Sequence, residues 1–294
     1  MNPQVQVLEE IARVTPFGVR FWDVTAITPA EAGLTVVAYP DGFPSLRFTA
    51  SANRTGVYFF HDLPGMRSVE YGSGDDAFWA ANPPRIPFTL EVSDPLGRYL
   101  PYQFPVLMPT HGLFGILDSP LAPALTPDAS WLPAFSAPAR ELPGPSAVVH
   151  AALLDITTGA PAAWALVTAQ VPGSPLTIGL ADDRGVVSLT LPYPEPRNSP
   201  FSSPLGPGSL KLSDQTWPLT ISIFYSARLS TLDLPSLDEI LHQGEATAWR
   251  DATRSAPAHI FTLQFARDLI LRSSDSVTGR ELPVLLITPA SSPL

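Results

Sequence analysis

The stretch RFTASANRTGVYFFHDLPG, residues 47–65, decides the fold that this sequence predicts. Its polar turn ends at Gly56, and the apolar run VYFF follows at residues 57–60. Asn and Gly supply the positive-φ positions of a tight turn, and β-branched and aromatic residues favour strands, so the stretch predicts a β-hairpin. The pattern returns in GLADDRGVVSLTLPYP, residues 179–194, where Asp182 and Gly185 precede another apolar run.

The order of elements around these two hairpins is also shared. Strand, turn, strand, hairpin, long loop and strand follow one another in both halves, and PFTLEV at 87–92 is echoed by PLTISI at 218–223. An order that is kept twice indicates internal duplication. We therefore expect an all-β fold with two tandem Ig/transthyretin-like β-sandwich domains, a proline-rich connecting strap and two short helices.

Turn signals and proline runs divide the chain into four parts. These are an N-terminal helical arm at 1–16, a first β-sandwich at 17–109, a proline-rich linker or strap at 110–145, and a second β-sandwich at 146–294. The last part contains a long loop at 192–216, a short helix at 236–242 and closing strands at 260–288. A capping box of Ser236 and Glu239 predicts the helix. Prolines in 101–109 allow only an edge strand or extended chain there.

Composition excludes several classes of protein. Proline accounts for 35 of 294 residues, which opposes a mainly helical fold because an interior proline costs a helix about 3 kcal/mol. The net charge is −10 and Lys211 is the only lysine, so nucleic acid and anionic membranes are poor partners. We expect no membrane span, no signal peptide and synthesis in the cytoplasm, because no long apolar run or leader pattern occurs. Cysteine is absent, which excludes disulfides and thiolate chemistry.

No pattern of catalytic residues stands out. The sequence has no G-x-S-x-G elbow and no phosphate-binding loop, and its five histidines show no metal-ligand spacing. Two paired carboxylates, Asp75–Asp76 and Asp182–Asp183, lack the further oxygens of a calcium loop. We therefore predict no catalytic residue, no cofactor and no metal. An enzyme assembled from scattered residues stays open if His61 or His150 meets a carboxylate and a hydroxyl.

Apolar residues of the arm and the strap are the candidate protein interface. The arm either packs on its own domain or docks on a neighbouring subunit, and the strap either covers its own domains or lies across another chain. Loop tryptophans such as Trp131 could form a sugar platform, or could anchor the linker or an interface. The candidate interface residues are Val7, Leu8, Ile11, Val14, Leu113, Phe114, Ile116, Leu117, Trp131, Leu132 and Phe135.

The hairpin of residues 53–65, with its Leu-Pro-Gly exit and the FTLEV strand at 88–92, resembles the carboxypeptidase regulatory-like domain. That family is a small transthyretin-like β-sandwich, usually accessory rather than catalytic. The resemblance covers 17–109 and, more loosely, 146–230, where Leu-Pro-Tyr replaces the Leu-Pro-Gly exit.

A fuller pattern is similar to accessory proteins encoded with bacterial contractile injection systems, the phage-tail-like particles. It consists of VRFWDVTA, NRTGVYFFHDLPG, SDPLGRYLPYQFPV, FSAPARELPG, AAWALVTAQ and ADDRGVVSLTLPYPEP. The resemblance implies a non-enzymatic structural adaptor in the cap or baseplate region. Such an adaptor would form a symmetric oligomer and contact tube, sheath, cap or baseplate subunits after its synthesis in the cytoplasm. The resemblance identifies no catalytic residue. The alternative is a carbohydrate-binding or adhesin-like tail module.

Overall fold

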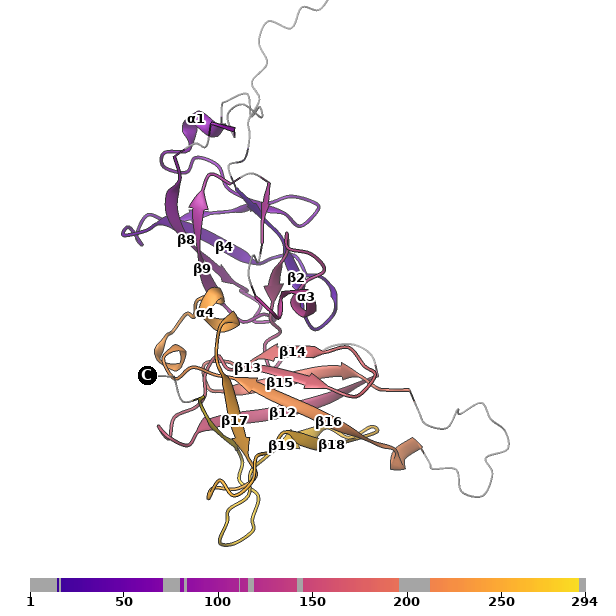
Figure 1. The fold of residues 1–294 in the computed structure, drawn as a ribbon. Helices are drawn as coiled ribbons and strands as arrows, with labels where there is room; N and C mark the ends of the chain where they lie inside the picture. The colour runs from indigo at the N-terminus through magenta and orange to yellow at the C-terminus, as the bar shows by residue number, and fades with distance from the viewer. Residues whose placement is uncertain are drawn as a thin grey trace, which may run out of the picture.

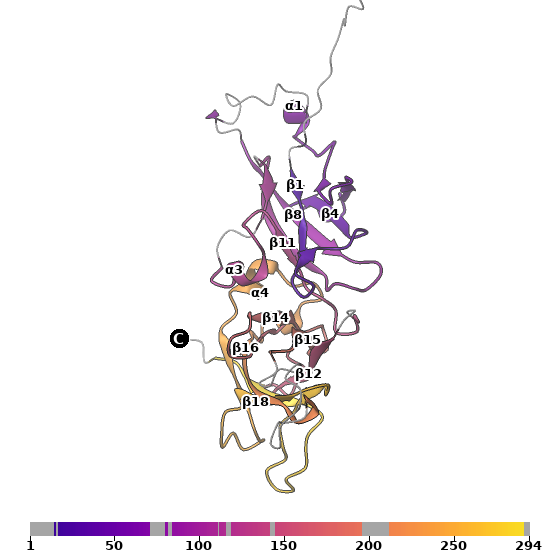
Figure 2. The same ribbon diagram turned by 90° about the vertical axis from the view of Figure 1, so that its right-hand side faces the viewer.

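Two β-domains lie end to end in the computed structural model, with the short helix α4 between them (Figures 1 and 2). The structure describes residues 15, 17–70, 80–81, 84–110, 112–115, 119–141, 145–195 and 212–290. The predicted N-terminal helix, Trp79 and the Asp75–Asp76 pair lie outside these residues, as does most of the 192–216 loop.

The first domain is built from two facing layers of strands. One layer is a sheet with the order β5-β4-β8-β9. The other consists of the sheets β10-β1-β7-β6 and β11-β2-β3, which are joined because only Arg20 separates β1 from β2. The bounds are β1 Gly18–Val19, β2 Phe21–Asp23, β3 Thr28–Pro29, β4 Thr35–Pro40, β5 Phe48–Thr49, β6 Ser51–Ala52, β7 Tyr58–Phe59, β8 Ile86–Ser93, β9 Tyr102–Met108, β10 Leu113–Phe114 and β11 Leu132–Ala134, with helices α1 Arg67–Glu70 and α3 Ala122–Leu125.

The second domain is one continuous nine-stranded sheet that folds back on itself. Its main path is β14-β13-β16-β17-β20-β12-β15, while β18 also pairs with β16 and β19 with β12. The bounds are β12 Ser146–Asp155, β13 Leu166–Gln170, β14 Thr177–Leu180, β15 Val186–Pro192, β16 Thr216–Phe224, β17 Glu245–Trp249, β18 Ile260–Gln264, β19 Leu269–Leu271 and β20 Leu285–Thr288, with helices η1 Leu212–Asp214, η2 Leu229–Thr231 and α4 Leu237–Leu241.

The two domains share most of their strand pairing. In the first, β1 pairs antiparallel with β7 and parallel with β10, and β2 pairs parallel with β11. In the second, β12 pairs antiparallel with β15 and parallel with β19 and β20. Likewise β4 lies between β5 and β8 as β13 lies between β14 and β16. The predicted fold of two tandem β-sandwiches is confirmed.

The two hairpin turns that the sequence singled out have the same hydrogen bonds. The side-chain oxygen of Asn53 accepts the amides of Thr55 (3.0 Å) and Val57 (2.9 Å). In the second domain, the Asp182 carboxylate accepts the amides of Arg184 (3.0 Å) and Val186 (2.8 Å). Each turn ends at a glycine with positive φ, Gly56 at 78° and Gly185 at 73°. An Asx residue and a glycine therefore direct the chain in both domains.

These matched glycines allow a direct test of packing around the turns. A Cβ atom on Gly185 would lie 2.7 Å from the Leu153 carbonyl oxygen, whereas one on Gly56 would meet nothing within 4 Å. We expect Gly56→Ala to cost about 1–2 kcal/mol through its positive φ alone. Gly185→Ala should cost about 1–3 kcal/mol more, because it also forces the backbone apart. Denaturant unfolding of both variants checks this, and equal losses would contradict it.

The proline-rich segment 110–145 does more than connect the domains. Its strands β10 and β11 pair in parallel with β1 and β2, and the amide of Leu132 donates to the Arg20 carbonyl at 2.9 Å. The described part of the strap therefore belongs to the first domain. As predicted from its prolines, β9 is an edge strand, because among the described residues it pairs within a sheet only with β8.

Two details of the second domain differ from the sequence analysis. Ser236 is the N-cap of α4, but its side chain makes no capping hydrogen bond, and Glu239 pairs with Arg228 (3.1 Å) instead of closing a capping box. The sequence also gave no sign of strand β17, because EATAW reads equally well as helix. The closing strands pair within their own domain.

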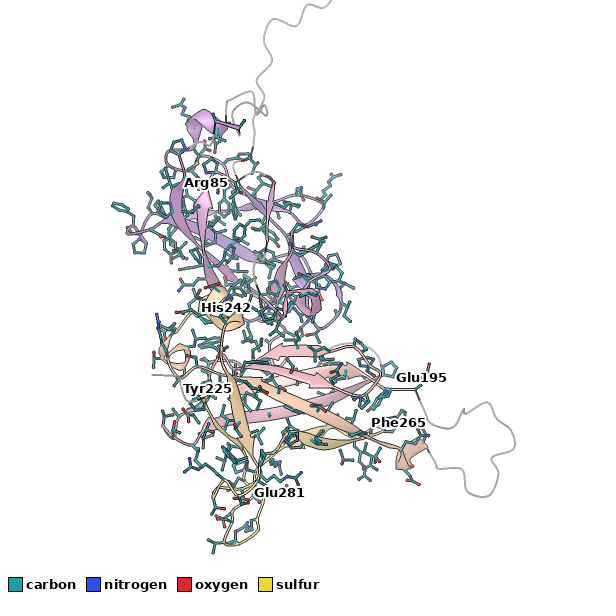
Figure 3. All side chains as sticks on the ribbon, viewed as in Figure 1. Arg85, Glu195, Tyr225, His242, Phe265 and Glu281 are labelled. Atoms are coloured by element: carbon teal, nitrogen blue, oxygen red, sulfur yellow. The ribbon has the colours of Figure 1, made fainter. Side chains whose placement is uncertain are left out.

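The segment that precedes β17 joins the domains. The Gln103 amide on β9 donates to the Pro235 carbonyl (2.9 Å), and its side chain donates to the Leu234 carbonyl (3.2 Å). The buried Ile240 of α4 lies in the same apolar cluster as the core of the first domain, and the Trp164 indole donates to the Leu232 carbonyl (2.9 Å). Figure 3 places His242, at the end of α4, beside this junction.

Candidate functional site

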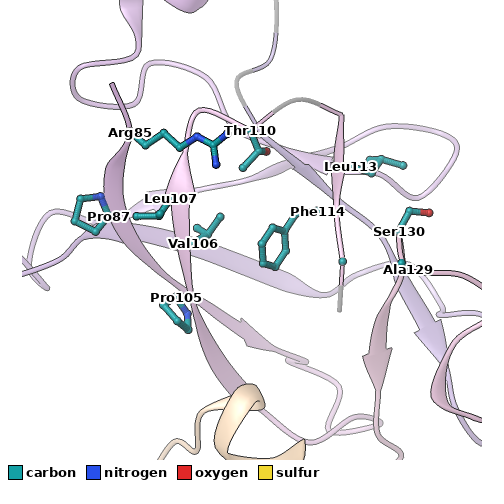
Figure 4. A pocket seen from close by; sticks show the side chains of 11 residues that line it. Arg85, Pro87, Pro105, Val106, Leu107, Thr110, Leu113, Phe114, Ala129 and Ser130 are labelled. Carbon is teal, nitrogen blue, oxygen red and sulfur yellow. The ribbon is translucent and has the colours of Figure 1, made fainter. Parts of the chain in front are cut away.

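A cleft opens on one side of the first domain, where its two layers separate. Its volume is about 740 Å³, and it lies between the end of β9 and strand β10 (Figure 4). Its lining is mostly apolar, with Pro105, Val106 and Leu107 on one side and Leu113 and Phe114 on the other. Leu107 is 51% exposed and Leu113 is 38% exposed, so apolar side chains remain in water at its rim. We refer to this site as the seam cleft.

Comparison with the second domain explains why the cleft exists. There, β17 pairs with both β16 and β20 and so ties one layer to the other. In the first domain, β9 pairs with β8 but not with β10 within the part of the chain that the structure describes. On the β9 side, the layers are bridged at the start of β9, where Tyr99 bridges Ser136 and the Tyr102 hydroxyl donates to the Pro133 carbonyl (2.8 Å). Beyond that point the seam stays open.

Three polar side chains line the seam cleft, those of Arg85, Thr110 and Ser130. The Thr110 hydroxyl is buried, and it has no hydrogen-bond partner among the described residues. Burying such a group without a partner costs free energy, so it is suited to a partner that enters the cleft. Arg85 is exposed and extends across the top of the cleft toward Thr110 (Figure 4). The site can therefore hold an apolar segment that ends in acceptor or acidic groups.

Apart from Trp131, which packs against Trp22, the predicted interface residues fall into three groups. Leu113 and Phe114 line the seam cleft. Leu132 and Phe135, in contrast, are buried in the core of the first domain, which corrects the expectation that they are available to a partner. The remainder, Val7, Leu8, Ile11, Val14, Ile116 and Leu117, lie outside the described residues.

Sequence reasoning missed the other side of the cleft. Arg85, Leu107 and Thr110 carry no motif, and they lie at the ends of strands β8 and β9. The one signal in the sequence was the prolines of 101–109, which rule out a central strand there. They indicated that the edge near Leu107 is open.

Trp131 anchors the strap. This was one of the two roles considered for the loop tryptophans. Its ring lies edge-on to Trp22 with centroids 5.4 Å apart, and the Arg20 guanidinium lies 4.0 Å from its centre. Such a cation–π contact is favourable by about 0.5–1 kcal/mol at an exposed site. Phe43 is the exposed aromatic residue among those that the structure describes, so these ranges contain no row of exposed rings.

A buried ionic network lies on the strap side of the first domain. The Arg140 guanidinium donates to Asp23 (2.6 Å), and the Tyr99 hydroxyl donates to the same carboxylate (2.9 Å). Burial raises the pKa of Tyr99 to about 12. Nearby, burial opposes ionisation of Asp94, but hydrogen bonds from Arg98 outweigh it and hold the pKa of the Asp94 carboxyl below its usual value. This network stabilises the domain and holds the strap in place, because its buried charges and hydrogen-bonding groups are paired with one another.

The histidines do not assemble a catalytic group in the described part of the chain. His61 contacts the Phe59 ring (5.2 Å between centroids), and its Nδ1 atom is buried without a hydrogen-bond partner there. His150 lies on β12 opposite Ser188 and Ile270. Asp182 is engaged by its own turn and by Arg184 (3.0 Å). The described residues contain no group of three acidic or histidine side chains that could hold a metal.

Comparisons with known proteins add little. No family model matches the chain and no curated protein matches it. Among solved structures, two mutants of the shaft pilin spaA from Lactobacillus rhamnosus GG are similar. One has 8% identity and a TM-score of 0.23 over 100% of this chain and 96% of the other. The second has 9% identity and a TM-score of 0.24 over 95% of this chain and 100% of the other. Likenesses this weak carry no argument about function.

The class of protein is therefore defined by the fold itself. The chain is an all-β protein of two tandem β-sandwich domains, with an open apolar seam in the first domain. None of the helices within the described ranges is long and apolar enough to cross a membrane.

Proposed function

We propose that this protein is a non-enzymatic structural subunit that binds other proteins in a multi-subunit assembly. The observation that carries the proposal is the seam cleft, an apolar site of about 740 Å³ between two strand edges. Unpaired strand edges are templates for another strand, and exposed apolar patches of this kind mark interaction sites. The junction at α4 supports the same role, because it joins the two domains into one elongated body.

The sequence resemblance directs this proposal to a particular assembly. The protein is an adaptor of a phage-tail-like contractile injection particle, in its cap or baseplate region. Its partners are tube, sheath, cap or baseplate subunits.

Light scattering of the purified chain, alone and after co-expression with the products of neighbouring genes, tests the proposal. We expect a discrete oligomer or a stable co-complex. Replacing Leu107 and Leu113 together by aspartate should abolish it, because charges would line the rim of the cleft. Val277→Asp is the matched control, since Val277 is 91% exposed and lies in the second domain. A wild-type chain that stays monomeric and ignores these partners would contradict the proposal.

A carbohydrate-binding or adhesin-like tail module is the alternative. A small pocket of about 40 Å³ beside Trp131 and Tyr58 is the one feature of the described residues that favours it. A glycan array decides between the two, with Trp131→Ala as the variant that should lose any signal.

A further inference from the structure

We propose that residues 4–10, QVQVLEE, of a second copy of this chain fill the seam cleft as an added strand. This inference rests on the proposed function, because it names the partner of the same surface. In the second domain, the corresponding gap between the layers is filled by a strand of the same chain, β17, which pairs with both β16 and β20.

The backbone of β9 is prepared for an added strand. The Gln103 amide points away from β8, because it donates to the Pro235 carbonyl on that side. Alternate residues of a strand face the same way, so the Pro105 carbonyl and the Leu107 amide also lie on the outer edge. Pro105 has no amide hydrogen to leave unpaired. The 235–236 segment covers the start of this edge, and the remainder borders the cleft.

The chemistry of residues 4–10 matches the lining of the cleft. In QVQVL, Val5 and Val7 alternate with glutamines, so a strand would direct both valines to one face. That face would meet Val106 and Phe114, while the glutamine side chains would lie on the exposed side of β9, with Leu107. Glu9 and Glu10 follow directly and complement the exposed Arg85. For these residues the proposal replaces the N-terminal helix that the sequence analysis predicts.

A second copy suits the geometry better than the chain's own arm. The first strand begins at Gly18 opposite Leu113, and the Phe17 ring lies 5.7 Å from that of Phe114. To fill its own cleft with residues 4–10, the arm would have to reverse its direction within the six residues 11–16. Thr15 precedes a proline, and this position is restricted to extended conformations. Residues 11–16, which link the segment to the first domain, can span up to about 20 Å when extended, so the neighbouring copy would pack close to the first domain.

Cysteine crosslinking tests the inference cleanly, because the chain contains no cysteine. Full-length Gln6→Cys and Leu107→Cys proteins, whose side chains would lie on the same face of the extended sheet, are mixed, oxidised and separated without reductant, with one of them enlarged by a tag. We expect a crosslinked heterodimer at about tenfold the yield obtained when Val277→Cys replaces Leu107→Cys, because docking raises the effective concentration of the two thiols. Adding Arg85→Glu to the Leu107→Cys protein should lower the yield, through repulsion of Glu9 and Glu10.

Each other outcome separates this inference from the proposed function. A crosslink that forms only when both cysteines are in the same chain would overturn the inference in favour of the chain's own arm. No crosslink above the Val277→Cys control, with an oligomer or co-complex still present by light scattering, would overturn the inference and leave the proposed function standing. No crosslink and a monomer without partners would overturn both.

Discussion

Replacing Asp23 by alanine is expected to lower the free energy of unfolding of the first domain by about 3–5 kcal/mol, the cost of removing one partner of a buried ion pair. Asp23 is 1% exposed and the Arg140 side chain is 8% exposed. The change leaves the Arg140 guanidinium buried without its closest carboxylate. It also removes the acceptor of the Tyr99 hydroxyl and of the amides of Thr25 and Ala26.

The second domain provides the matched control for this prediction. Asp155 ends β12 as Asp23 ends β2, it is fully buried, and it accepts the Thr157 amide (2.8 Å). It has no arginine partner among the described residues. Asp155→Ala should therefore cost less, about 1–3 kcal/mol for lost hydrogen bonds. Denaturant unfolding with domain-resolved hydrogen exchange measures both, and equal losses would show that the Arg140 pair adds nothing.

Replacing Phe135 by alanine is the second large effect that we expect, a loss of about 3–5 kcal/mol. Phe135 is 1% exposed and packs edge-on against Tyr102, with ring centroids 6.4 Å apart. The substitution opens a cavity between the strap and β9 that neighbouring side chains cannot fill. Thermal and denaturant unfolding of the full chain measure the loss.

Leu96→Ala is the control for this substitution. Leu96 is 72% exposed, so its removal should change stability by no more than about 0.5 kcal/mol. A Phe135→Ala protein with unchanged stability but lost partner binding would restore Phe135 to the interface that the sequence predicted.

Local chemistry explains what could be predicted from sequence. The Asn53 and Asp182 turns depend on residues within four positions of each other, so the local sequence alone is enough to locate them. The edge position of β9 followed from Pro105, because a proline cannot donate within a ladder. The repeated order of strands then predicted two similar domains.

The strap and the candidate site could not be predicted in the same way. Leu132 pairs with Phe21 across more than a hundred positions of sequence, and the apolar residues of 110–145 show no period that identifies the surface they cover. An apolar run can be buried equally well in the core of its own domain or in an interface with another chain. The Arg140–Asp23 contact spans 117 positions and left no local signature.

The sequence by itself determined the strands around the two hairpins, the two Asx–glycine turns and their duplicated order, because each depends on near neighbours along the chain. Only the tertiary structure decided that the strap enters the first sandwich, that the segment before β17 joins the domains, and that one seam closes while the other stays open. Those outcomes depend on which distant strand edges find one another, as β17 finds β20 and β9 finds no strand of the described chain beyond β8.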